Sequence, residues 1–269
     1  MSINNKGPLI GQGRTADVYT WGDNQVLKLF HKRVSLEWIE REARTGNLAF
    51  EAGLATAKVG SVINVEDRHG IVFERVDGPS MLAEISAKPW KLRRSARILA
   101  ELHAAVHEKK LPDLPSQKQI IRDNVYSANV LDGEQKQVIG RLLDELPDGD
   151  LLCHGDFHPD NIIVSENGAI TIDWTTATRG NPLADVARTS LILQLGEMPP
   201  DTPVLTRLIV RLGRKLFHRI YLRRYFRLRP DNRDHLIDWK LPITAARLGD
   251  GIPEERDQLL TLIRNRIGG

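Results

Sequence analysis

The sequence contains very little cysteine and no long apolar run. Its one cysteine, Cys153, excludes an internal disulfide framework and is typical of a reducing compartment. The first residues, Met1 to Lys6, lack a basic region followed by an apolar stretch, so no secretory signal is predicted. No uncharged apolar run approaches the length needed to cross a bilayer. We therefore expect a cytoplasmic protein without a membrane partner.

Net charge is also small, but the charge is unevenly distributed. The formal net charge is only +3 over 269 residues. Residues 201–269, however, contain fifteen Lys and Arg against eight Asp and Glu, a surplus of +7. Such a surplus is typical either of a solvated helical face or of a surface that meets anionic or neutral partners. No nucleic-acid-binding motif accompanies it, so we expect no nucleic-acid partner.

The first third of the chain alternates between short strand-like runs and turns. Short β-branched and aromatic runs divided by Gly, Asp and Asn are typical of hairpins. They predict strands at residues 8–10, 17–21, 25–30, 59–65 and 70–76. His69-Gly70 is predicted to lie in the turn between the last two strands. Ser35 is a suitable N-cap for a helix that continues to about Ala52, with Gly53 as its stop.

After Gly78 the pattern becomes mainly helical. Apolar residues recur at three- and four-residue steps from Leu92 to Val106, which predicts a helix with one apolar face. The remaining predictions are two helices within 117–146, a buried strand at 151–153, a hairpin at 162–172, and helices beyond Pro182 with breaks near Pro199-Pro200, Pro230 and Pro253. Together these patterns predict an α+β fold, with a β-rich lobe at 1–77 and a helical lobe at 78–269.

The polar residues that suggest chemistry follow the predicted strand at 151–153. They read His154-Gly155-Asp156-Phe157-His158-Pro159-Asp160-Asn161, with the H-x-D-x-x-x-x-N spacing of a kinase catalytic loop. Phosphoryl transfer needs a carboxylate that orients the attacking hydroxyl and accepts its proton, and Asp156 suits that role. Asn161 and Asp173 suit the role of Mg²⁺ ligands, because this ion prefers hard oxygen ligands.

This loop is followed by Ile172-Asp173-Trp174 and by Gly180-Asn181-Pro182-Leu183-Ala184-Asp185. The combination resembles the hallmark of the aminoglycoside phosphotransferase and choline kinase superfamily of small-molecule kinases. The resemblance spans most of the chain, is strong over residues 151–190 and weakens beyond 200. It implies a protein-kinase-like bilobal fold, with a small β-rich N-lobe and a larger, mostly helical C-lobe. It also implies that His154 holds the loop through hydrogen bonds, and we expect Asp185 to anchor the same loop.

The two histidines of the loop allow another interpretation. His154 and His158 are four residues apart, and on a helix this spacing could form a zinc site. Gly155 and Pro159 oppose such a helix, so the sequence does not favour zinc. A structural role is the better prediction for His158, although the pattern leaves its role open.

A second motif predicts a nucleotide site near the N-terminus. Residues 11–18 have the pattern G-x-G-x-x-A-x-V between two strands, and glycine lets a backbone approach phosphates. Gly11, Gly13 and Thr15 are the predicted contacts, although such a turn could also be a simple hairpin turn. Ala16 stands where a protein kinase has its third glycine. Lys28 follows on the next strand, where a kinase lysine meets the α- and β-phosphates.

Other residues complete the predicted nucleotide site. Glu42 matches the family's pattern best as the ion-pair partner of Lys28, and Glu40 on the same helix remains an alternative. Backbone groups of Glu74 and Val76, after the apolar run 71–73, are expected to read the adenine edge. The predicted cofactors are ATP, with GTP left open, and Mg²⁺.

The second half of the chain favours a small acceptor over a peptide. Asp173 and Asp185 are only twelve residues apart, and there is no Asp-Phe-Gly or Ala-Pro-Glu motif, so the peptide platform of protein kinases is missing. Tyr225, Trp239 and Arg247 are candidates for the acceptor pocket, where aromatic rings would suit a sugar and arginine an acidic group. The alternative is that the aromatic residues fill the helical core. The basic surplus favours a neutral or anionic hydroxyl compound over an aminoglycoside.

Two functions of other classes are also weighed. One is a non-catalytic nucleotide-binding scaffold of the same fold, which the presence of Lys28, Asp156, Asn161 and Asp173 together disfavours. The other is an anion-binding adaptor that uses the basic C-terminal helices. The sequence leaves open the identity of the acceptor and whether the protein is a monomer or a homodimer.

Overall fold

The structure, a computed structural model, describes residues 5–195, 203–230 and 233–267. Its contacts divide the chain into two compact units. The first, the sheet unit, contains residues 1–84 and 159–176, and the second, the helical unit, contains residues 85–158 and 177–269. These units differ from the lobes predicted at 1–77 and 78–269, because a later hairpin packs with the N-terminal residues. The lobe division itself stays a prediction.

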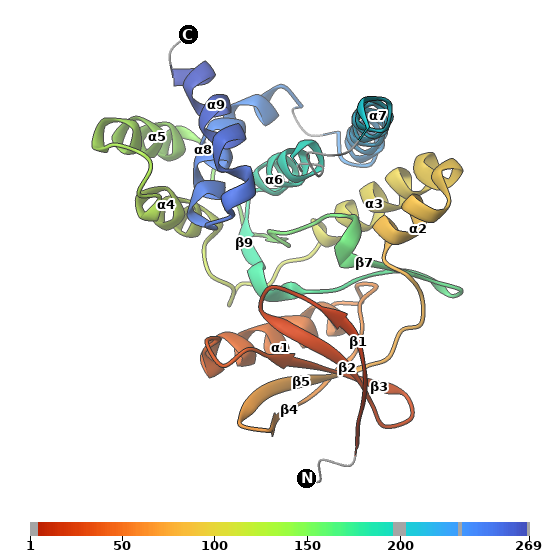
Figure 1. Cartoon of the computed structure of the whole chain (residues 1–269). Coiled ribbons are helices and arrows are strands. Elements are labelled where there is room, and N and C mark those ends of the chain that lie inside the picture. The colour runs from red at the N-terminus through yellow and green to blue at the C-terminus, as the bar shows by residue number, and fades with distance from the viewer. Residues whose placement is uncertain (1–4, 196–202, 231–232, 268–269) are drawn as a thin grey trace. The chain divides into compact units, whose positions relative to one another are not determined.

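An antiparallel sheet forms the centre of the sheet unit, with the strand order β1-β2-β3-β5-β4 (Figure 1). The strands are β1 (Lys6–Gln12), β2 (Ala16–Trp21), β3 (Gln25–Phe30), β4 (Val59–Val65) and β5 (Arg68–Glu74). Helix α1 (Leu36–Glu51) lies against this sheet. Ser35 caps α1 by accepting a hydrogen bond from the Trp38 N–H, and Gly53 follows the helix with a φ of 77°. The predicted strands and this helix are confirmed, apart from one turn.

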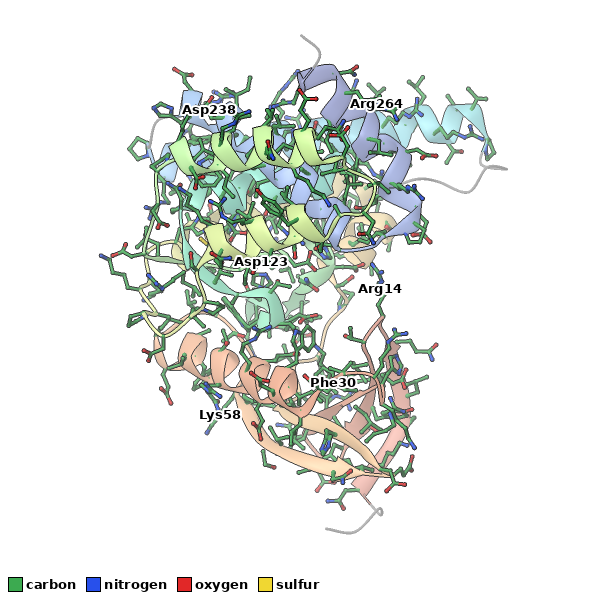
Figure 2. All side chains as sticks on the ribbon, turned by 90° about the vertical axis from the view of Figure 1, so that its left-hand side faces the viewer. Arg14, Phe30, Lys58, Asp123, Asp238 and Arg264 are labelled. Atoms are coloured by element: carbon green, nitrogen blue, oxygen red, sulfur yellow. The ribbon has the colours of Figure 1, made fainter. Side chains whose placement is uncertain are left out.

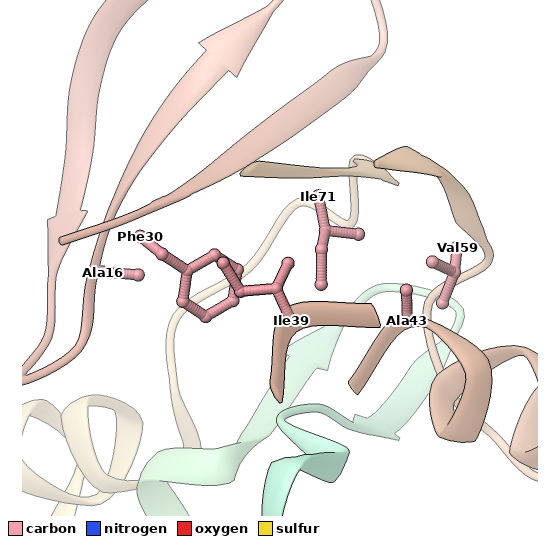
Figure 3. Packing of buried hydrophobic residues seen from close by; sticks show 6 residues of the cluster. All are labelled: Ala16, Phe30, Ile39, Ala43, Val59 and Ile71. Carbon is pink, nitrogen blue, oxygen red and sulfur yellow. The ribbon is translucent and has the colours of Figure 1, made fainter. Parts of the chain in front are cut away.

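Side-chain alternation along the strands determines which residues pack under α1. Figure 3 shows six buried side chains of this core, namely Ala16, Phe30, Ile39, Ala43, Val59 and Ile71. On β3, Phe30 faces α1, whereas Leu27 and Leu29 pack in a separate cluster with Trp21. Successive residues of a strand point to opposite faces, so Lys28 shares the α1 face with Phe30. Burying these apolar side chains is the main stabilising contribution of the unit, at roughly 25 cal/mol per Å² of apolar area.

The turn between β4 and β5 lies at Glu66–Asp67, so the prediction of a turn at His69-Gly70 was wrong. Glu66 and Asp67 have φ values of 52° and 59°, as a two-residue hairpin turn requires. Gly70 pairs with Leu29 within the sheet, and a Cβ there would lie 2.7 Å from Leu27 Cδ1. The absence of a side chain at Gly70 therefore allows close packing within the sheet. Glu-Asp carries no glycine or asparagine signal, which is why the sequence did not reveal the turn.

The hairpin that joins the sheet unit late in the chain has the predicted position. It consists of β7 (Ile162–Ser165) and β8 (Gly168–Thr171), between the 3₁₀ helices η3 (Pro159–Asn161) and η4 (Trp174–Thr176). The Thr171 N–H donates to the Ala55 carbonyl at 2.8 Å, and Trp174 Nε1 donates to Thr56 Oγ1 at 2.9 Å. The Val164 N–H donates to the Pro79 carbonyl at 2.9 Å. These bonds attach the hairpin to the loop before β4 and to the loop after β5.

The helical unit consists of long helices and one short strand pair. Its helices are α3 (Leu92–Val106), α4 (Gln117–Ser127), α5 (Gly133–Glu145), α6 (Pro182–Gln194), α7 (Val204–Leu228), α8 (Leu236–Gly249) and α9 (Arg256–Ile267), with the 3₁₀ turns η2 (Pro89–Lys91), η5 (Arg233–His235) and η6 (Pro253–Glu255). Strands β6 (Leu151–Cys153) and β9 (Thr178–Gly180) pair in antiparallel fashion, and α2 (Met81–Ala87) spans the boundary between the units. α3 packs on α7, and α8 packs on α4 and α6.

Helix α3 has the apolar face that the sequence predicted, since Ala96, Leu99, Ala100 and Ala104 are buried. Other helices carry charged side chains on their outer faces, such as Asp123 on α4, Asp238 on α8 and Arg264 on α9 (Figure 2). The breaks near Pro230 and Pro253 are confirmed, and the break at Pro199-Pro200 lies outside the described residues. Among the described helices, none is both long and apolar enough to cross a membrane.

Candidate active site

Lys28 is held between two carboxylates in the sheet unit. Its Nζ lies 2.6 Å from Glu42 Oε1 and 3.2 Å from Asp173 Oδ1. Glu42 occupies the inner face of α1 together with Ile39 and is only 3% exposed, whereas Glu40 points to solvent. The ion-pair partner that the sequence left open between these two glutamates is therefore Glu42.

Burial and charge act in opposite directions on this cluster. Burial disfavours the charged form of Lys28, but the carboxylates of Asp173 and Glu42 outweigh it and raise the pKa of the lysine. Burial also raises the pKa of Glu42, against the attraction of Lys28, and the nearby Asp173 carboxylate adds to the rise. The Lys28 ammonium group consequently stays protonated at neutral pH.

Thr175 is a member of this cluster that the sequence reasoning missed. Its hydroxyl lies 2.7 Å from Glu42 Oε2 and 2.5 Å from Asp173 Oδ1, so it can donate to either carboxylate. The available signal was its position two residues after Asp173, but a threonine in a polar loop is too common to single out. Thr175 holds the two acidic side chains in one orientation around the lysine.

Asp173 reaches Lys28 because the chain turns sharply after β8. Its φ is 66°, which is a left-handed backbone conformation. Glycine adopts this conformation most readily, and asparagine and aspartate tolerate it better than most other residues. Its side chain is 38% exposed, so the carboxylate is within reach of a ligand. The Asn161 carbonyl accepts a hydrogen bond from the Ile172 N–H at 2.9 Å, which ties the η3 turn to the residue before Asp173. An amide and a carboxylate on two joined segments fit a Mg²⁺ ion, which takes few protein ligands and prefers oxygen.

The predicted phosphate-binding turn is a tight connection between β1 and β2. The Gly13 N–H donates to the Ala16 carbonyl at 2.8 Å, and the Thr15 carbonyl accepts from the His31 N–H at 2.8 Å. Gly11 lies at the end of β1, opposite Val18. Ala16 is buried in the core under α1, so the residue in place of the third kinase glycine serves packing.

The residues predicted to contact adenine lie at the end of β5 and directly after it. Glu74 ends β5, and its N–H donates to the Lys58 carbonyl at 2.9 Å. Val76 follows in a segment that ends at Gly78, whose φ is 152°. A Cβ at Gly78 would lie 2.2 Å from the Val164 carbonyl oxygen, so only glycine lets the chain pass the β7 strand here.

Asp156 lies in the helical unit, among basic groups. Its Oδ2 is 3.3 Å from His158 Nε2, and its Oδ1 is 3.9 Å from Arg247 Nη1. Burial opposes ionisation of Asp156, but the hydrogen bond and charge of His158, together with the charges of Arg188 and Arg247, lower its pKa below the usual range. The carboxylate is therefore ionised at neutral pH and can accept a hydrogen bond or a proton. The role of His158, left open by the sequence, includes this contact.

The backbone of the same loop is bound by Asp185 at the start of α6. The His154 N–H donates to Asp185 Oδ2 at 2.6 Å, and the Gly155 N–H donates to Oδ1 at 2.9 Å. His154 Nδ1 accepts from the Asp156 N–H at 3.2 Å, and Arg188 donates to the Gly155 carbonyl. The N–H groups of residues 154 to 156 are thus bound by the buried side chains of Asp185 and His154, and the Gly155 carbonyl is bound by Arg188.

Asp185 in turn is held by His103 and His107, which the sequence analysis did not single out as site residues. Nε2 of His103 and Nε2 of His107 donate to Asp185 Oδ2 at 3.1 and 3.2 Å, and their Nδ1 atoms accept from Tyr221 and Tyr225 at 2.7 Å. Burial, together with the neighbouring His107, lowers the pKa of His103 to about 4, and burial also lowers that of His107. The signal in the sequence was that the two histidines, His103 and His107, and the two tyrosines, Tyr221 and Tyr225, have the same spacing of four residues.

This cluster has the composition of a metal site but the geometry of a hydrogen-bond network. His103, His107 and Asp185 could each offer a ligand atom, and these atoms lie within 4.8 Å of one another. Every ring nitrogen, however, already has a hydrogen-bond partner of the right kind, because the neutral imidazoles donate to the carboxylate and accept from the phenols. Hydrogen bonds therefore account for the cluster.

Two residues expected in the acceptor pocket are instead part of the core. Tyr225 and Trp239 are 0% exposed, and Tyr225 uses its hydroxyl on His107. Neither presents a surface to a ligand, because the aromatic side chains fill the space between the helices. Tyr225 and Trp239 thus fill the helical core, as the alternative interpretation of the sequence had it.

Arg247 lies beside Asp156, but its guanidinium is already engaged. Nε and Nη2 donate to the two carboxylate oxygens of Glu255 at 2.7 and 2.9 Å, and Nη1 lies 3.2 Å from Asp250 Oδ2. Arg188 also pairs with Asp250, at 2.7 Å. The arginines therefore add positive potential around Asp156 while acidic side chains hold them in place.

The small antiparallel sheet and the helical unit form a protein-kinase-like fold, with a β-rich N-lobe and a mostly helical C-lobe. The chain belongs to the phosphotransferase enzyme family, whose sequence model matches residues 6–239. The superfamily predicted from the loop at 154–161 and the segments 172–174 and 180–185 is confirmed by this match.

Solved structures similar to this chain include aminoglycoside kinases and a choline kinase. The aminoglycoside phosphotransferase APH(4)-Ia has a TM-score of 0.65 and 15% identity, with 96% of this chain and 90% of that one covered. The streptomycin–ATP–APH(2")-IIa ternary complex has a TM-score of 0.60 and 15% identity, with 94% and 90% covered. Choline kinase from Cryptosporidium parvum Iowa II has a TM-score of 0.57 and 14% identity, with 100% and 90% covered. At these identities the likeness shows the fold alone. A search of curated proteins gave no match.

Proposed function

We propose that this protein transfers the γ-phosphoryl group of ATP to a hydroxyl group of a small molecule. The observation that carries the proposal is the ammonium group of Lys28, held between the buried Glu42 and the accessible Asp173. A lasting positive charge next to a carboxylate that can take a metal is the arrangement that phosphoryl transfer from a nucleotide needs. Membership of the phosphotransferase family supports the same reaction.

The sheet unit carries the nucleotide end of the proposed reaction. Lys28 would bind the α- and β-phosphates, and Gly11, Gly13 and Thr15 would cover them. The carbonyl of Glu74 and the N–H of Val76 would contact the adenine. Asn161 and Asp173 would hold Mg²⁺, which when bound neutralises phosphate charge. The APH(2")-IIa complex, which contains ATP, supports a nucleotide of this kind.

Asp156, in the helical unit, carries the acceptor end. Its carboxylate is ionised, so it can orient the acceptor hydroxyl and take its proton as the oxygen attacks phosphorus. His154 and Asp185 would hold the loop, since they bind its backbone N–H groups. We assign His103 and His107 a supporting role, because both bind the Asp185 oxygen that accepts from the His154 N–H.

The charges near Asp156 favour an acceptor without a large positive charge. Arg188, Arg247 and His158 surround the carboxylate and lower its pKa. Asp250 and Glu255 pair with the two arginines, but the guanidinium groups still lie next to Asp156 and oppose a polycationic aminoglycoside there more than a neutral or anionic hydroxyl compound. We therefore propose that such a compound is phosphorylated faster than kanamycin-type substrates.

The test is a screen of candidate acceptors that measures ADP release with Mg²⁺ and ATP. The panel contains aminoglycosides, macrolides, amino alcohols, sugars and nucleosides. With the acceptor found, Asp156→Ala and the nearly isosteric Asp156→Asn should lower kcat by about 10²–10⁴-fold, because the proton acceptor is lost. The matched control is Asp160→Asn, in the same loop, whose carboxylate accepts a hydrogen bond from Ser80 at 2.8 Å.

Three results would count against the proposal. Near-normal turnover of Asp156→Asn would exclude Asp156 as the proton acceptor. ATP binding without phosphoryl transfer to any member of the panel would favour a nucleotide-binding scaffold. Turnover of an aminoglycoside with kcat/KM above about 10⁴ M⁻¹s⁻¹ would contradict only the acceptor preference.

A further inference from the structure

The first half of α7 has an exposed apolar face. Six large aliphatic side chains there are between 37% and 80% exposed, namely Val204, Leu205, Leu208, Ile209, Leu212 and Leu216. Their spacing of three and four residues places them on one side of the helix, and we call them the α7 stripe. Phe217 and Tyr221, on the other side of α7, are buried where this helix packs on α3. Contiguous apolar side chains on a surface mark an interaction site.

A row of basic residues follows the α7 stripe along the same helix. Its members recur every four residues, at Arg207, Arg211, Lys215, Arg219, Arg223 and Arg227. Residues three apart are neighbours on a helix, so Arg211 lies next to Leu208 and Lys215 next to Leu212. Between Val204 and Leu228 the sequence has eight Lys and Arg and no Asp or Glu. The basic surplus beyond residue 201 is therefore concentrated here, beside an apolar surface.

This charge pattern argues against a second copy of the chain as the occupant. Two α7 stripes packed on each other would bring their basic rows together at the rim of the interface. α7 has no acidic side chain to pair with them, so like charges would face like charges. The partner must instead combine an apolar layer with negative charge.

The shape of this region favours a membrane surface over a protein. Gly213 lies against Leu92, the first residue of α3, since a Cβ there would be 3.7 Å from Leu92 Cδ1. α3 and α7 run in the same direction, so residues 204–212 extend roughly 13 Å past the start of α3, at 1.5 Å per residue. The α7 stripe thus lies mainly on the part of α7 before its contact with the start of α3, and all six of its side chains are aliphatic and exposed. Protein partners of a helix usually anchor aromatic or arginine side chains in pockets, whereas a bilayer needs no matching shape.

We propose that the α7 stripe and its basic row bind the surface of an anionic lipid bilayer. The aliphatic side chains would enter the boundary between headgroups and acyl chains, and the basic row would bind the lipid phosphates. The sequence-based expectation of no membrane partner was drawn from the lack of a membrane-crossing run. That lack does not concern a helix that lies in the interface. The proposal is independent of the proposed kinase reaction.

The test is cosedimentation of the full chain with lipid vesicles. Vesicles of phosphatidylcholine with about one third phosphatidylglycerol should bind the protein at least 10-fold more tightly than vesicles of phosphatidylcholine alone. Raising the salt from about 0.1 M to about 0.5 M should weaken the binding, because screening reduces the electrostatic contribution.

Paired variants separate the two contributions. Leu208→Gln with Leu212→Gln, and separately Arg211→Gln with Lys215→Gln, should each weaken binding to the anionic vesicles at least 10-fold. Controls of the same chemistry on other helices are Leu142→Gln with Leu262→Gln and Arg141→Gln with Arg264→Gln, all exposed in the structure. These controls should bind like the wild type. Circular dichroism confirms that every variant is folded.

Three outcomes would overturn the proposal. One is a wild-type protein that stays in the supernatant with anionic vesicles. Another is equal binding of the α7 variants and the control variants. The third is a dimer in sedimentation velocity that the Leu208→Gln and Leu212→Gln pair converts to a monomer, since the occupant would then be a second copy.

Discussion

At the scale of single residues, the neighbours of Lys28 explain how its ammonium group stays charged although the side chain is mostly buried. Glu42 is buried and pairs with the lysine from one side, while Asp173 approaches from the other with an accessible carboxylate. A buried charge is costly unless it is paired and hydrogen-bonded, and the Thr175 hydroxyl can donate a further hydrogen bond to either acid. The cluster is therefore a single unit in which each side chain depends on the others.

The replacement Asp173→Asn tests the metal-binding role at this scale. Asparagine tolerates the left-handed backbone at φ 66° and keeps one oxygen, but it lacks the charge. We expect Mg²⁺ to tighten nucleotide binding to the wild type, and this effect of Mg²⁺ to fall at least 10-fold in the variant. Calorimetric titration of ATP with and without Mg²⁺ measures it. The exposed Asp67, also at positive φ, provides the control Asp67→Asn. An unchanged Mg²⁺ dependence in Asp173→Asn would exclude the ligand role.

At the scale of elements, three helices act together on one loop. α6 contributes Asp185, and the loop's first two N–H groups donate to its carboxylate. α3 contributes His103 and its C-cap residue His107, which bind the same carboxylate, and α7 contributes the two tyrosines that fix the histidine rings. Burial opposes the charge of Asp185, but the hydrogen bonds from both histidines hold its pKa well below the usual range. An ionised acceptor at the centre of this network keeps the loop in one conformation.

The variant Asp185→Asn should separate positioning from binding. An amide presents one oxygen where the carboxylate presents two. Either the Gly155 N–H, which donates to Oδ1, or the three donors on Oδ2 therefore lose their acceptor. A small displacement of a reacting group can lower the rate by about 10²-fold, and we expect a fall of that order in kcat. KM for ATP should stay within about twofold, because the residues proposed to bind nucleotide lie in the sheet unit.

Two measurements distinguish this effect from simple loss of folded protein. The number of ATP sites per chain in calorimetry should remain near that of the wild type, and the exposed Asp123→Asn on α4 should leave all constants unchanged. If kcat and the number of sites fell by the same factor, Asp185 would have only a structural role.

At the scale of the whole molecule, buried neutral histidines couple stability to pH. His103 is completely buried, and its pKa is lowered from 6.5 to about 4 by burial and by the neighbouring His107. His218 is also lowered to about 4, by burial and by Lys240. The unfolded chain binds protons at these sites between pH 4 and pH 6.5 and the folded chain does not. Stability therefore rises with pH across this window, is complete above about 6.5, and is lost as the pH falls.

Urea denaturation at several pH values tests this coupling. Between pH 6.5 and pH 5, each such histidine should reduce the free energy of unfolding by up to about 2 kcal/mol, at 1.36 kcal/mol per pH unit. His103→Gln should lower stability at pH 7 but also flatten this pH dependence. The control His235→Gln, at a side chain that is 56% exposed, should leave the slope unchanged. A stability that is constant from pH 7 to pH 5 would contradict the assignment of a neutral buried His103.

The sequence was most informative where the evidence is local. The loop at 154–161 and the strands around Lys28 depend on spacing and on side-chain alternation, and both are visible in the order of residues. The turn at Glu66–Asp67 was missed because its two residues carry no turn signal, while Gly70 suggested a turn but serves packing. Local patterns thus predicted the elements well and one connection wrongly.

What the sequence determined by itself is the family, the succession of strands and helices and the identity of the polar residues in the loop. Only the tertiary structure decided that Glu42 rather than Glu40 meets Lys28, because this depends on which face of α1 turns to the sheet. It alone placed Tyr225 and Trp239 in the core and joined His103 and His107 to Asp185, which lies about eighty residues further along the chain. Contacts between distant segments depend on how helices pack, and one sequence carries no periodic signal for them.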